Sequence, residues 1–259
     1  MRSPIAMRAS ADFGIVSDGW HAMGRLGWTR SEEDVDLWLV RFEDLDSSPT
    51  DDCLSSEERA RAASYLGQDL RDNFVKRRVW ARRVVSQYAM CPWDEISFSY
   101  GPHGKPVPVG PGPDIPPVNW SFSDSFCLLA IGRDVDVGVD IQKITPFPDI
   151  EGVAELALHR REIEFLRENP SEHSAFFEIW ARREAVFKGM GQGLHEAMTA
   201  ISVMAENGNY LSTITGHSGD TWQLRAASGV PGYALAVSWR DTGKPVSPKT
   251  SCAELRRRL

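Results

Sequence analysis

The sequence has few cysteines, and their spacing excludes the usual structural zinc motifs. Its four cysteines stand far apart, at Cys53, Cys91, Cys127 and Cys252. Structural zinc is normally held by cysteine pairs at short spacing, so we expect free thiols in a reducing compartment instead. The histidines also lack the HExxH spacing of zinc proteases, because His159 is followed by Glu162 and His195 by Glu196. A histidine-based metal site is therefore not indicated.

The sequence also lacks long apolar runs and an excess of positive charge. No apolar run approaches the roughly 20 residues of a membrane-spanning helix. The N-terminus has no signal-peptide pattern. The formal net charge of −7 argues against a general nucleic-acid-binding protein. We therefore expect a cytoplasmic protein that binds neither membrane nor nucleic acid. The strongest basic cluster is Lys76, Arg77, Arg78, Arg82 and Arg83, a pattern that usually marks a solvated helix face.

Hydrophobic periodicity predicts two similar sets of elements. The first set has strands at 35–42, 96–100, 118–123, 126–132 and 135–141, and helices at 54–65 and 71–90. The second set has helices at 150–158, 161–168 and 171–190, then strands at 201–204, 210–215, 222–226 and 233–239. The proline-rich stretch 107–117 is expected to be a loop.

This alternation predicts an α+β fold: a pseudo-twofold pair of similar α+β subdomains, each an antiparallel sheet with a long helix, with the active site between them. The expected divisions are a variable lead-in (1–33), an N-terminal subdomain (34–137), a C-terminal subdomain (138–241) and a peripheral tail (242–259).

Two segments near and after the middle of the chain carry the candidate chemistry. Residues 138–142 read as a short buried strand that presents Asp140. In the predicted helix 180–188, Trp180, Glu184 and Lys188 recur every four residues and share one face. Two acids and a lysine together suit a divalent cation and a polyphosphate. Taken singly, Asp140 is an ordinary turn residue. Glu184 and Lys188 make an ordinary exposed helix pair worth about 0.2–0.5 kcal/mol, and Trp180 an ordinary core residue.

Taken in order along the chain, several segments resemble the 4'-phosphopantetheinyl transferases of the larger, monomeric, two-lobed type. The matching segments are a basic helix at 54–61, an Arg-bearing helix at 74–82, a Gly-Lys-Pro turn at 104–106, a strand like Asn-x-Ser-His-Ser at 119–123, a strand like Gly-x-Asp-x-Glu at 138–142, the helix 180–188 and the turn 191–194. The resemblance spans residues 35–240, and the shared order makes coincidence a poor explanation.

The resemblance implies transfer of 4'-phosphopantetheine from coenzyme A to a serine of an apo acyl- or peptidyl-carrier protein, as in holo-[acyl-carrier-protein] synthases. The second product is adenosine 3',5'-bisphosphate. Attack of a hydroxyl on a pyrophosphate needs positioning and charge neutralisation, and Mg²⁺ with oxygen ligands suits that task. The expected partners are coenzyme A and a carrier protein. A monomer is expected, because two lobes in one chain remove the need for a partner subunit.

The resemblance also implies roles for individual residues. Asp140 and Glu184 are the expected metal ligands, and Glu184 is also a candidate base for the serine proton. Lys188 is expected to neutralise the transferring phosphate or assist the leaving group. Lys105 is expected at the 3'-phosphate of coenzyme A, with Ser121 hydrogen-bonding nearby. Further phosphate or nucleotide contacts are expected from Arg82, Arg61 and Arg78.

The sequence departs from the family pattern at three positions. Gln142 stands where a glutamate is usual, so this expected third metal position offers a neutral carbonyl or holds a water. Phe122 replaces a histidine and removes a phosphate donor, while Arg183 replaces a lysine with altered geometry. Because of these departures, a second function stays open: the protein is a non-catalytic relative of the transferases that binds coenzyme A or a carrier protein. An unrelated acidic scaffold protein is the third alternative.

Overall fold

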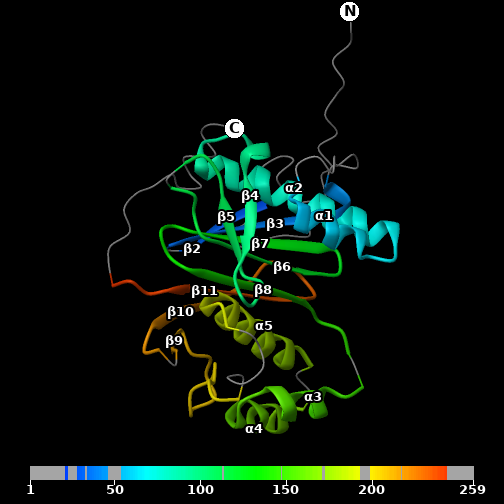
Figure 1. Cartoon of the computed structure of the whole chain (residues 1–259). Coiled ribbons are helices and arrows are strands. Elements are labelled where there is room, and N and C mark those ends of the chain that lie inside the picture. Colours follow the sequence, from blue (N-terminus) through cyan, green and yellow to red (C-terminus); the bar gives the residue numbers. More distant parts are fainter. Residues whose placement is uncertain are drawn as a thin grey trace, which may run out of the picture.

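The computed structural model describes residues 21–22, 28–32, 34–45, 54–112, 114–146, 148–170, 173–192, 199–216 and 218–243. Their main elements stack in layers, in the order helix, sheet, sheet, helix (Figure 1). Every strand pair is antiparallel. The fold is therefore α+β with antiparallel sheets, as the sequence predicts. Within these residues, no helix has the length and apolar character needed to cross a membrane.

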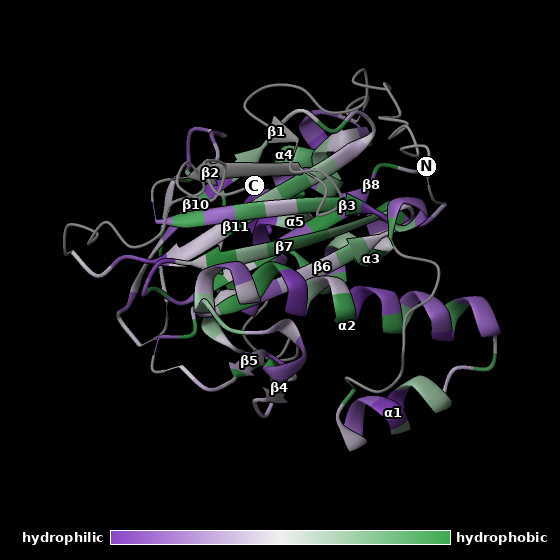
Figure 2. Ribbon diagram, turned by 90° about the horizontal axis from the view of Figure 1, so that it is seen from above, coloured by the Kyte–Doolittle hydropathy of each residue, from purple (hydrophilic) through white to green (hydrophobic). Residues whose placement is uncertain are grey.

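The first sheet has the strand order β1-β2-β3-β7-β6. Its strands are β1 (His21–Ala22), β2 (Trp28–Glu32), β3 (Val35–Arg41), β6 (Val118–Ser123) and β7 (Phe126–Gly132). Helix α2 (Gln68–Ala89) covers its outer face, where Trp38 and Leu129 from the sheet pack with Val84 and Val85. Figure 2 shows this long helix with alternating apolar and polar residues. Helix α1 (Ser56–Ala63) precedes it, and Ser55 caps its N-terminus in a capping box with Glu58.

The second sheet has the strand order β8-β11-β10-β9. Its strands are β8 (Val137–Lys143), β9 (Thr213–Thr215), β10 (Thr221–Ala227) and β11 (Tyr233–Arg240). Helix α5 (His173–Met190) covers its outer face. Helices α3 (Ile150–Ala157) and α4 (Arg160–Glu168) lie beyond α5 (Figure 1).

The central core lies between the inner faces of the two sheets. Leu37 and Leu128 of the first sheet pack there with Val139 and Ile141 of β8. Because side chains alternate along a strand, the intervening residues of β8 face the opposite way, towards α5. Asp140 is one of them. Burial of the β8 valine and isoleucine in the core therefore fixes the acid on the helix-facing side.

A two-stranded hairpin extends from the first half of the chain. It pairs β4 (Ser97–Tyr100) with β5 (Pro106–Val109), where the sequence predicted only a loop from residue 107. That prediction was wrong for β5. The ladder pairs Ser97 with Val109 and Ser99 with Val107, and a two-stranded ribbon leaves each strand with an open edge. Prolines are tolerated at such edge positions, where a missing N–H costs no ladder hydrogen bond.

Other elements differ from their predictions mainly at the ends. The predicted lead-in supplies β1 and β2, which extend the first sheet beyond β3. The predicted strand at 201–204 is reduced to a single bridge between Met204 and Tyr210. Two 3-10 helices, η2 (Phe42–Asp44) and η4 (Trp93–Glu95), were not predicted. The turn residues at 193 and 194, and His195 with Glu196, lie outside the described residues.

Candidate active site

The two sheets meet along β6 and β8, and side chains of β6 make the joint. The Asn119 Oδ1 accepts a hydrogen bond from the Val139 backbone N–H at 3.1 Å. The Ser123 hydroxyl oxygen accepts one from the Lys143 backbone N–H at 2.9 Å. Ser121 lies between them on the same face of the strand, because alternate residues share a face. The Asn-x-Ser-x-Ser pattern thus holds β6 against β8 and directs Ser121 towards the second lobe.

Asp140 is the centre of a buried polar cluster. Its side chain is 1% exposed. The carboxylate Oδ1 accepts hydrogen bonds from the Ser121 hydroxyl at 2.6 Å and from the Lys188 Nζ at 2.6 Å. The Gln142 Nε2 donates to Oδ2 at 2.8 Å. Ser121, Gln142 and Lys188, which come from three elements, therefore converge on one carboxylate, and a single lysine neutralises its charge.

A close approach of α5 to β8 makes this convergence possible. A Cβ at Gly138 would lie 2.0 Å from the Ala185 carbonyl oxygen and 2.2 Å from the Gly189 nitrogen. Glycine is therefore required at 138, because any side chain would push the helix off the sheet. The Ser238 hydroxyl of β11 donates to the same Ala185 carbonyl at 2.8 Å. The helix backbone rests directly on the sheet, so the residues flanking Ala185 lie over β8.

Glu184 lies in this contact region beside Asp140 and Lys188. Its side chain is 8% exposed. Burial raises the pKa of the Glu184 carboxyl to about 7, an effect opposed by the Lys188 charge and supported by the Asp140 charge. Among the described residues, no hydrogen-bond donor to the Glu184 carboxylate is found. A buried carboxylate without a donor is poised to accept a proton or a cation.

The oxygen atoms of this cluster fit a magnesium ion. Within the described residues, no group of three or more His, Cys, Asp and Glu side chains is arranged to hold a metal. Asp140 and Glu184 nevertheless supply two neighbouring carboxylates, and Gln142 donates through its nitrogen, which leaves its carbonyl oxygen as an acceptor. Magnesium commonly takes one or two carboxylates and completes its coordination with waters and substrate phosphates. The donor set therefore fits magnesium rather than zinc.

Lys105 stands at the end of the β4–β5 hairpin and reaches the C-terminal end of α5. Its Nζ donates to the Gly189 carbonyl at 2.6 Å and to the Asp136 carboxylate at 2.9 Å. A cavity of about 150 Å³ lies beside it. Lys188 and Trp120 line this cavity together with Lys105. The predicted phosphate lysine and the lysine at Asp140 therefore border one space.

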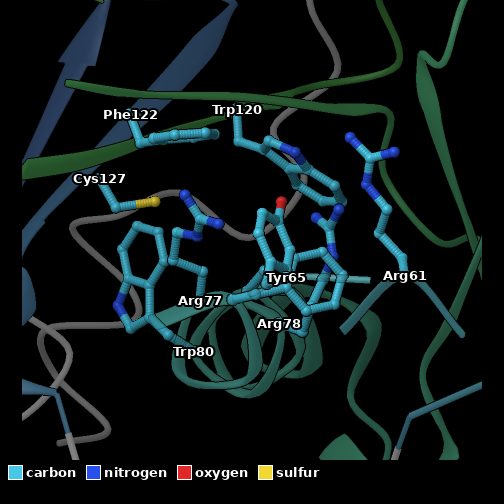
Figure 3. A pocket seen from close by; sticks show the side chains of 10 residues that line it. Arg61, Tyr65, Arg77, Arg78, Trp80, Trp120, Phe122 and Cys127 are labelled. Atoms are coloured by element: carbon cyan, nitrogen blue, oxygen red, sulfur yellow. The ribbon is translucent and has the colours of Figure 1, made fainter. Parts of the chain in front are cut away.

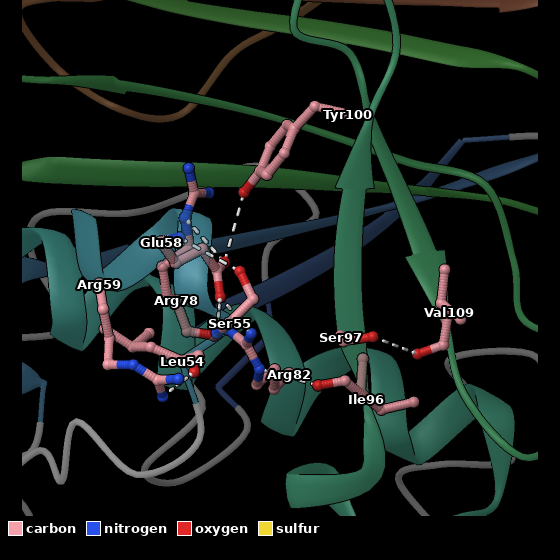
Figure 4. A network of polar contacts seen from close by, with 10 residues as sticks. All are labelled: Leu54, Ser55, Glu58, Arg59, Arg78, Arg82, Ile96, Ser97, Tyr100 and Val109. Carbon is pink, nitrogen blue, oxygen red and sulfur yellow. Dashed lines mark hydrogen bonds and ion pairs between the residues drawn. The ribbon is translucent and has the colours of Figure 1, made fainter. Parts of the chain in front are cut away.

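Arg82 is placed in the protein interior and does not line the cavity beside Lys105. Its side chain is 0% exposed, and its Nη2 donates to Glu58 Oε2 at 2.5 Å while its Nε donates to the Ile96 carbonyl at 2.8 Å. Glu58 also pairs with Arg78 at 3.4 Å and accepts from the Tyr100 hydroxyl at 3.3 Å (Figure 4). This network ties α1, α2 and β4 together. The geometry therefore gives Arg82 a structural role, and the ligand contact expected from the sequence stays a prediction.

Arg61 and Arg78 line a second cavity, of about 190 Å³ (Figure 3). Trp120 and Phe122 of β6 form part of its wall. The Arg78 guanidinium lies 4.3 Å from the centre of the Trp120 ring, and burial lowers its pKa. These two arginines are not among the contacts of Asp140. They border a second cavity, and Trp120 lines both this cavity and the one beside Lys105.

Arg183, the residue before Glu184, is directed away from the cluster. Its Nη1 donates to Glu162 Oε2 at 2.7 Å and to the Ile201 carbonyl at 2.6 Å. Glu162 accepts in addition from the Val203 backbone N–H at 2.7 Å. Arg183 therefore joins α5 to α4 and to the segment after α5. The sequence did not predict this role, because Arg183 was noted only as the residue before Glu184.

Sequence reasoning did not single out three residues that the geometry brings to the site. Asn119 joins the sheets, Trp120 lines both cavities, and Asp136 pairs with Lys105. For Asn119 a signal existed, since it stands two residues before Ser121 in a strand and shares its face. For Asp136 there was none, because its partner lies 31 positions away.

Comparisons with known proteins agree with this geometry. The 4'-phosphopantetheinyl transferase superfamily model matches residues 136–238, which include β8 and α5. The chain is 29% identical over 171 residues to the 4'-phosphopantetheinyl transferase HetI of Nostoc sp., covering 64% of this chain and 72% of the relative. It is 25% identical over 199 residues to the 4'-phosphopantetheinyl transferase Sfp of Bacillus subtilis, covering 71% of this chain and 86% of the relative.

A mammalian protein is also similar. Over 154 residues the chain is 27% identical to the L-aminoadipate-semialdehyde dehydrogenase-phosphopantetheinyl transferase of Mus musculus, covering 54% of this chain and 49% of the relative. The segments that hold Asp140, Glu184 and Lys188 fall inside the residues matched by the family model. The chain is therefore similar to the 4'-phosphopantetheinyl transferase superfamily over the segment that holds β8 and α5.

Proposed function

We propose that this protein transfers 4'-phosphopantetheine from coenzyme A to a serine hydroxyl of an apo acyl- or peptidyl-carrier protein. The products are the holo carrier and adenosine 3',5'-bisphosphate. One observation carries the proposal: Asp140, Glu184 and Lys188 gather at the contact of β8 with α5, inside the segment that matches the 4'-phosphopantetheinyl transferase superfamily model. A cytoplasmic monomer is part of the same proposal.

The reaction requires a proton acceptor beside the attacking hydroxyl. The serine oxygen forms a bond to the phosphorus that carries the pantetheine arm, and the bond from that phosphorus to the bridging oxygen breaks. Glu184 takes the serine proton, since a carboxyl group with a pKa near 7 exchanges protons readily at neutral pH. The leaving phosphate keeps the electron pair of the broken bond, and the nearby Lys188 ammonium stabilises its charge.

Asp140 and Glu184 are the residues that would hold a magnesium ion, with Gln142 contributing its carbonyl oxygen directly or through a water. When bound, the ion supplies charge neutralisation to the pyrophosphate oxygens. Ser121 donates to Asp140 and thereby fixes the direction of its carboxylate. Lys188, which pairs with Asp140 at 2.6 Å, is close enough to turn towards a phosphate once a cation shares that carboxylate.

The two cavities on either side of Trp120 suit an extended co-substrate. Lys105 and Lys188 border the first, and arginines border the second. Coenzyme A carries a pyrophosphate and a separate 3'-phosphate, so it needs more than one cationic region along its length. The spacing of cations on both sides of one indole ring supports coenzyme A rather than a simple phosphate as co-substrate.

The direct test is a mass measurement on a panel of apo carrier proteins after incubation with the protein, magnesium and coenzyme A. The expected result is a mass increase of one phosphopantetheine group on at least one carrier. Glu184→Gln is expected to abolish that increase, while Glu178→Gln on the same helix retains it.

A non-catalytic relative that binds coenzyme A remains the second candidate, because Gln142 lowers the negative charge at the expected metal position. It requires binding of coenzyme A with no mass change on any carrier of the panel, and that outcome would replace the transferase proposal.

A further inference from the structure

Hydrogen bonds engage both carboxylate oxygens of Asp140. Oδ1 accepts from the Ser121 hydroxyl and from the Lys188 Nζ, each at 2.6 Å, and Oδ2 accepts from the Gln142 Nε2 at 2.8 Å. A carboxylate offers about four lone-pair positions, so these three donors use most of them. A cation that binds Asp140 therefore has to compete with donors that the protein itself supplies.

Two of these donors also bring positive charge to the carboxylate. Lys188 places a full charge at Oδ1, and the amide N–H groups of Gln142 place a partial charge at Oδ2. Asp140 is 1% exposed, so water screens these charges only weakly. The protein alone therefore already neutralises Asp140, and little attraction remains for a divalent cation at either oxygen.

Gln142 is the position at which this chain departs from the usual glutamate. A glutamate here would add a second negative charge beside Asp140, and it could not donate to Oδ2 when ionised. The amide does the opposite on both counts. Its nitrogen must be the atom that faces Oδ2, because an amide oxygen only 2.8 Å from a carboxylate oxygen would be repelled. Glutamine therefore favours the Asp140–Lys188 pair over a bound cation.

The pyrophosphate of coenzyme A would supply what residue 142 lacks. Phosphate oxygens are anionic ligands of the kind that Mg²⁺ prefers. They would also offer the Lys188 ammonium a new partner. The Lys188 side chain is 30% exposed and lines the cavity of about 150 Å³ beside Lys105, so it has room to turn away from Asp140. A bound pyrophosphate would thus add ligands for the cation and remove a competitor from Oδ1.

We propose that Gln142 makes magnesium binding depend on coenzyme A. The Gln142 amide and Lys188 hold the Asp140 carboxylate, and this carboxylate becomes available to a cation once the pyrophosphate has drawn Lys188 away. The inference rests on the proposed function and adds an order of binding at the same site: coenzyme A precedes or accompanies magnesium. Because binding coupling is reciprocal, magnesium tightens coenzyme A binding by the same factor.

Isothermal titration of Mg²⁺ into the protein, with and without coenzyme A, measures this coupling. The wild type should bind Mg²⁺ at least about tenfold more tightly when coenzyme A is present. Gln142→Glu should tighten Mg²⁺ binding to the protein alone by about 10- to 100-fold, since a carboxylate replaces a donor beside Asp140. With coenzyme A present, the gain should stay below about threefold, because the pyrophosphate already supplies anionic ligands.

Gln223→Glu is the matched control. Gln223 of β10 donates its Nε2 to the Asp241 carboxylate at 2.9 Å, so the substitution makes the same chemical change in the same sheet, two strands away from β8. It should leave the Mg²⁺ affinity and its dependence on coenzyme A unchanged.

Two results would overturn the inference: a wild type that binds Mg²⁺ equally well with and without coenzyme A, or an unchanged Mg²⁺ affinity in Gln142→Glu. Neither would affect the proposed function if a carrier of the panel still gains mass. Coupling found without any carrier modification would keep the inference and replace the transferase proposal. An absence of Mg²⁺ binding under both conditions would overturn both.

Urea unfolding gives a second readout that needs neither coenzyme A nor a carrier. In protein treated with a chelator, Gln142→Glu places two carboxylates side by side without the amide donor, so its unfolding midpoint should fall below that of the wild type. The same concentration of Mg²⁺ should then raise the midpoint of the variant more than that of the wild type, because tighter binding stabilises the folded state more. Equal responses of the two proteins to Mg²⁺ would contradict the role assigned to Gln142.

Discussion

The two long helices each cover the outer face of a sheet but contact it through different groups. Helix α5 rests on β8 with its backbone, because Gly138 and Gly189 leave no side chain between helix and sheet. Helix α2 packs through bulky side chains such as Trp80 and Val84. Contact through glycine brings acids and a lysine together over Asp140, whereas contact through bulky residues leaves a cavity of about 190 Å³. The same layer arrangement thus produces the candidate active site on one side and a cavity lined by arginines on the other.

The helices are fastened in a similar manner despite this difference. On the α2 side, Glu58 of α1 pairs with the buried Arg82 at 2.5 Å. On the α5 side, Glu162 of α4 pairs with the buried Arg183 at 2.7 Å. In both places an acid on a short helix near its N-terminus holds an arginine of the long helix. The two halves therefore hold their long helices with the same kind of buried Glu–Arg pair. They differ in the side chains that each long helix presents.

Replacing the acid on α5 should have the largest effect. We expect Glu184→Gln to lower the rate of phosphopantetheine transfer by about 100- to 10,000-fold, as is usual for loss of a general base. Single-turnover transfer to an apo carrier measures this. Glu178→Gln, six positions earlier on the helix, should stay within about twofold. Comparable losses in both variants would mean that α5 contributes through its packing alone.

Breaking either buried Glu–Arg pair should destabilise the fold more than any surface change. Glu58→Gln and Glu162→Gln each leave a buried guanidinium without its counter-charge, so we expect each to lower the free energy of unfolding by about 3–5 kcal/mol. Urea unfolding followed by tryptophan fluorescence gives the value. In the control Glu164→Gln, which removes the exposed pair with Arg160, the change should stay below about 1 kcal/mol. A loss confined to one of the two buried pairs would break the parallel between the halves.

Adding one methyl group at Gly138 should test the close approach of α5. The new Cβ would lie 2.0 Å from the Ala185 carbonyl, so the helix must move. We expect Gly138→Ala to cost about 1–3 kcal/mol of unfolding free energy and to reduce transfer strongly. Gly101→Ala is the control, because its new Cβ would make only an ordinary van der Waals contact, 3.8 Å from the Lys105 carbonyl oxygen. Full activity in Gly138→Ala would show that the alignment over β8 does not need backbone contact.

The smallest expected effect is a pH dependence of stability in the metal-free protein. The folded state raises the Glu184 pKa from 4.5 to about 7, so between these values it binds a proton more tightly than the unfolded chain. This group therefore makes unfolding easier as pH rises from about 5 to 7, by no more than about 3 kcal/mol. Glu184→Gln removes the dependence. Chelator-treated wild type and variant, unfolded by urea at several pH values, should diverge over that interval; parallel curves would contradict the burial argument.

Much of the fold follows from local sequence pattern. The strands 118–123 and 126–132 were predicted with the bounds that the structure shows, because alternation and turn residues are strong there. Strand β5 was missed because its prolines mark a loop in most settings, and only its pairing with β4 makes it a strand. The strand expected at 201–204 failed for the opposite reason. Its apolar residues pack against α5, with a single bridge as strand pairing.

The candidate site was less predictable than the fold. A family resemblance pointed to Asp140, Glu184 and Lys188, and period-four spacing on a helix placed the last two together. Burial of Arg82 was not predictable, since its partner Glu58 lies 24 positions away and both look like surface residues in the sequence. Which arginine of a basic run meets a carboxylate depends on tertiary contacts.

The central claim is that Asp140 and Glu184 together hold a divalent cation at the contact of β8 with α5. Isothermal titration of Mg²⁺ into the protein in the presence of coenzyme A tests it most directly, with Asp140→Asn and Glu184→Gln beside the wild type. We expect the wild type to bind about one ion, and each variant to bind it at least tenfold more weakly. Unchanged affinity in both variants would contradict the claim.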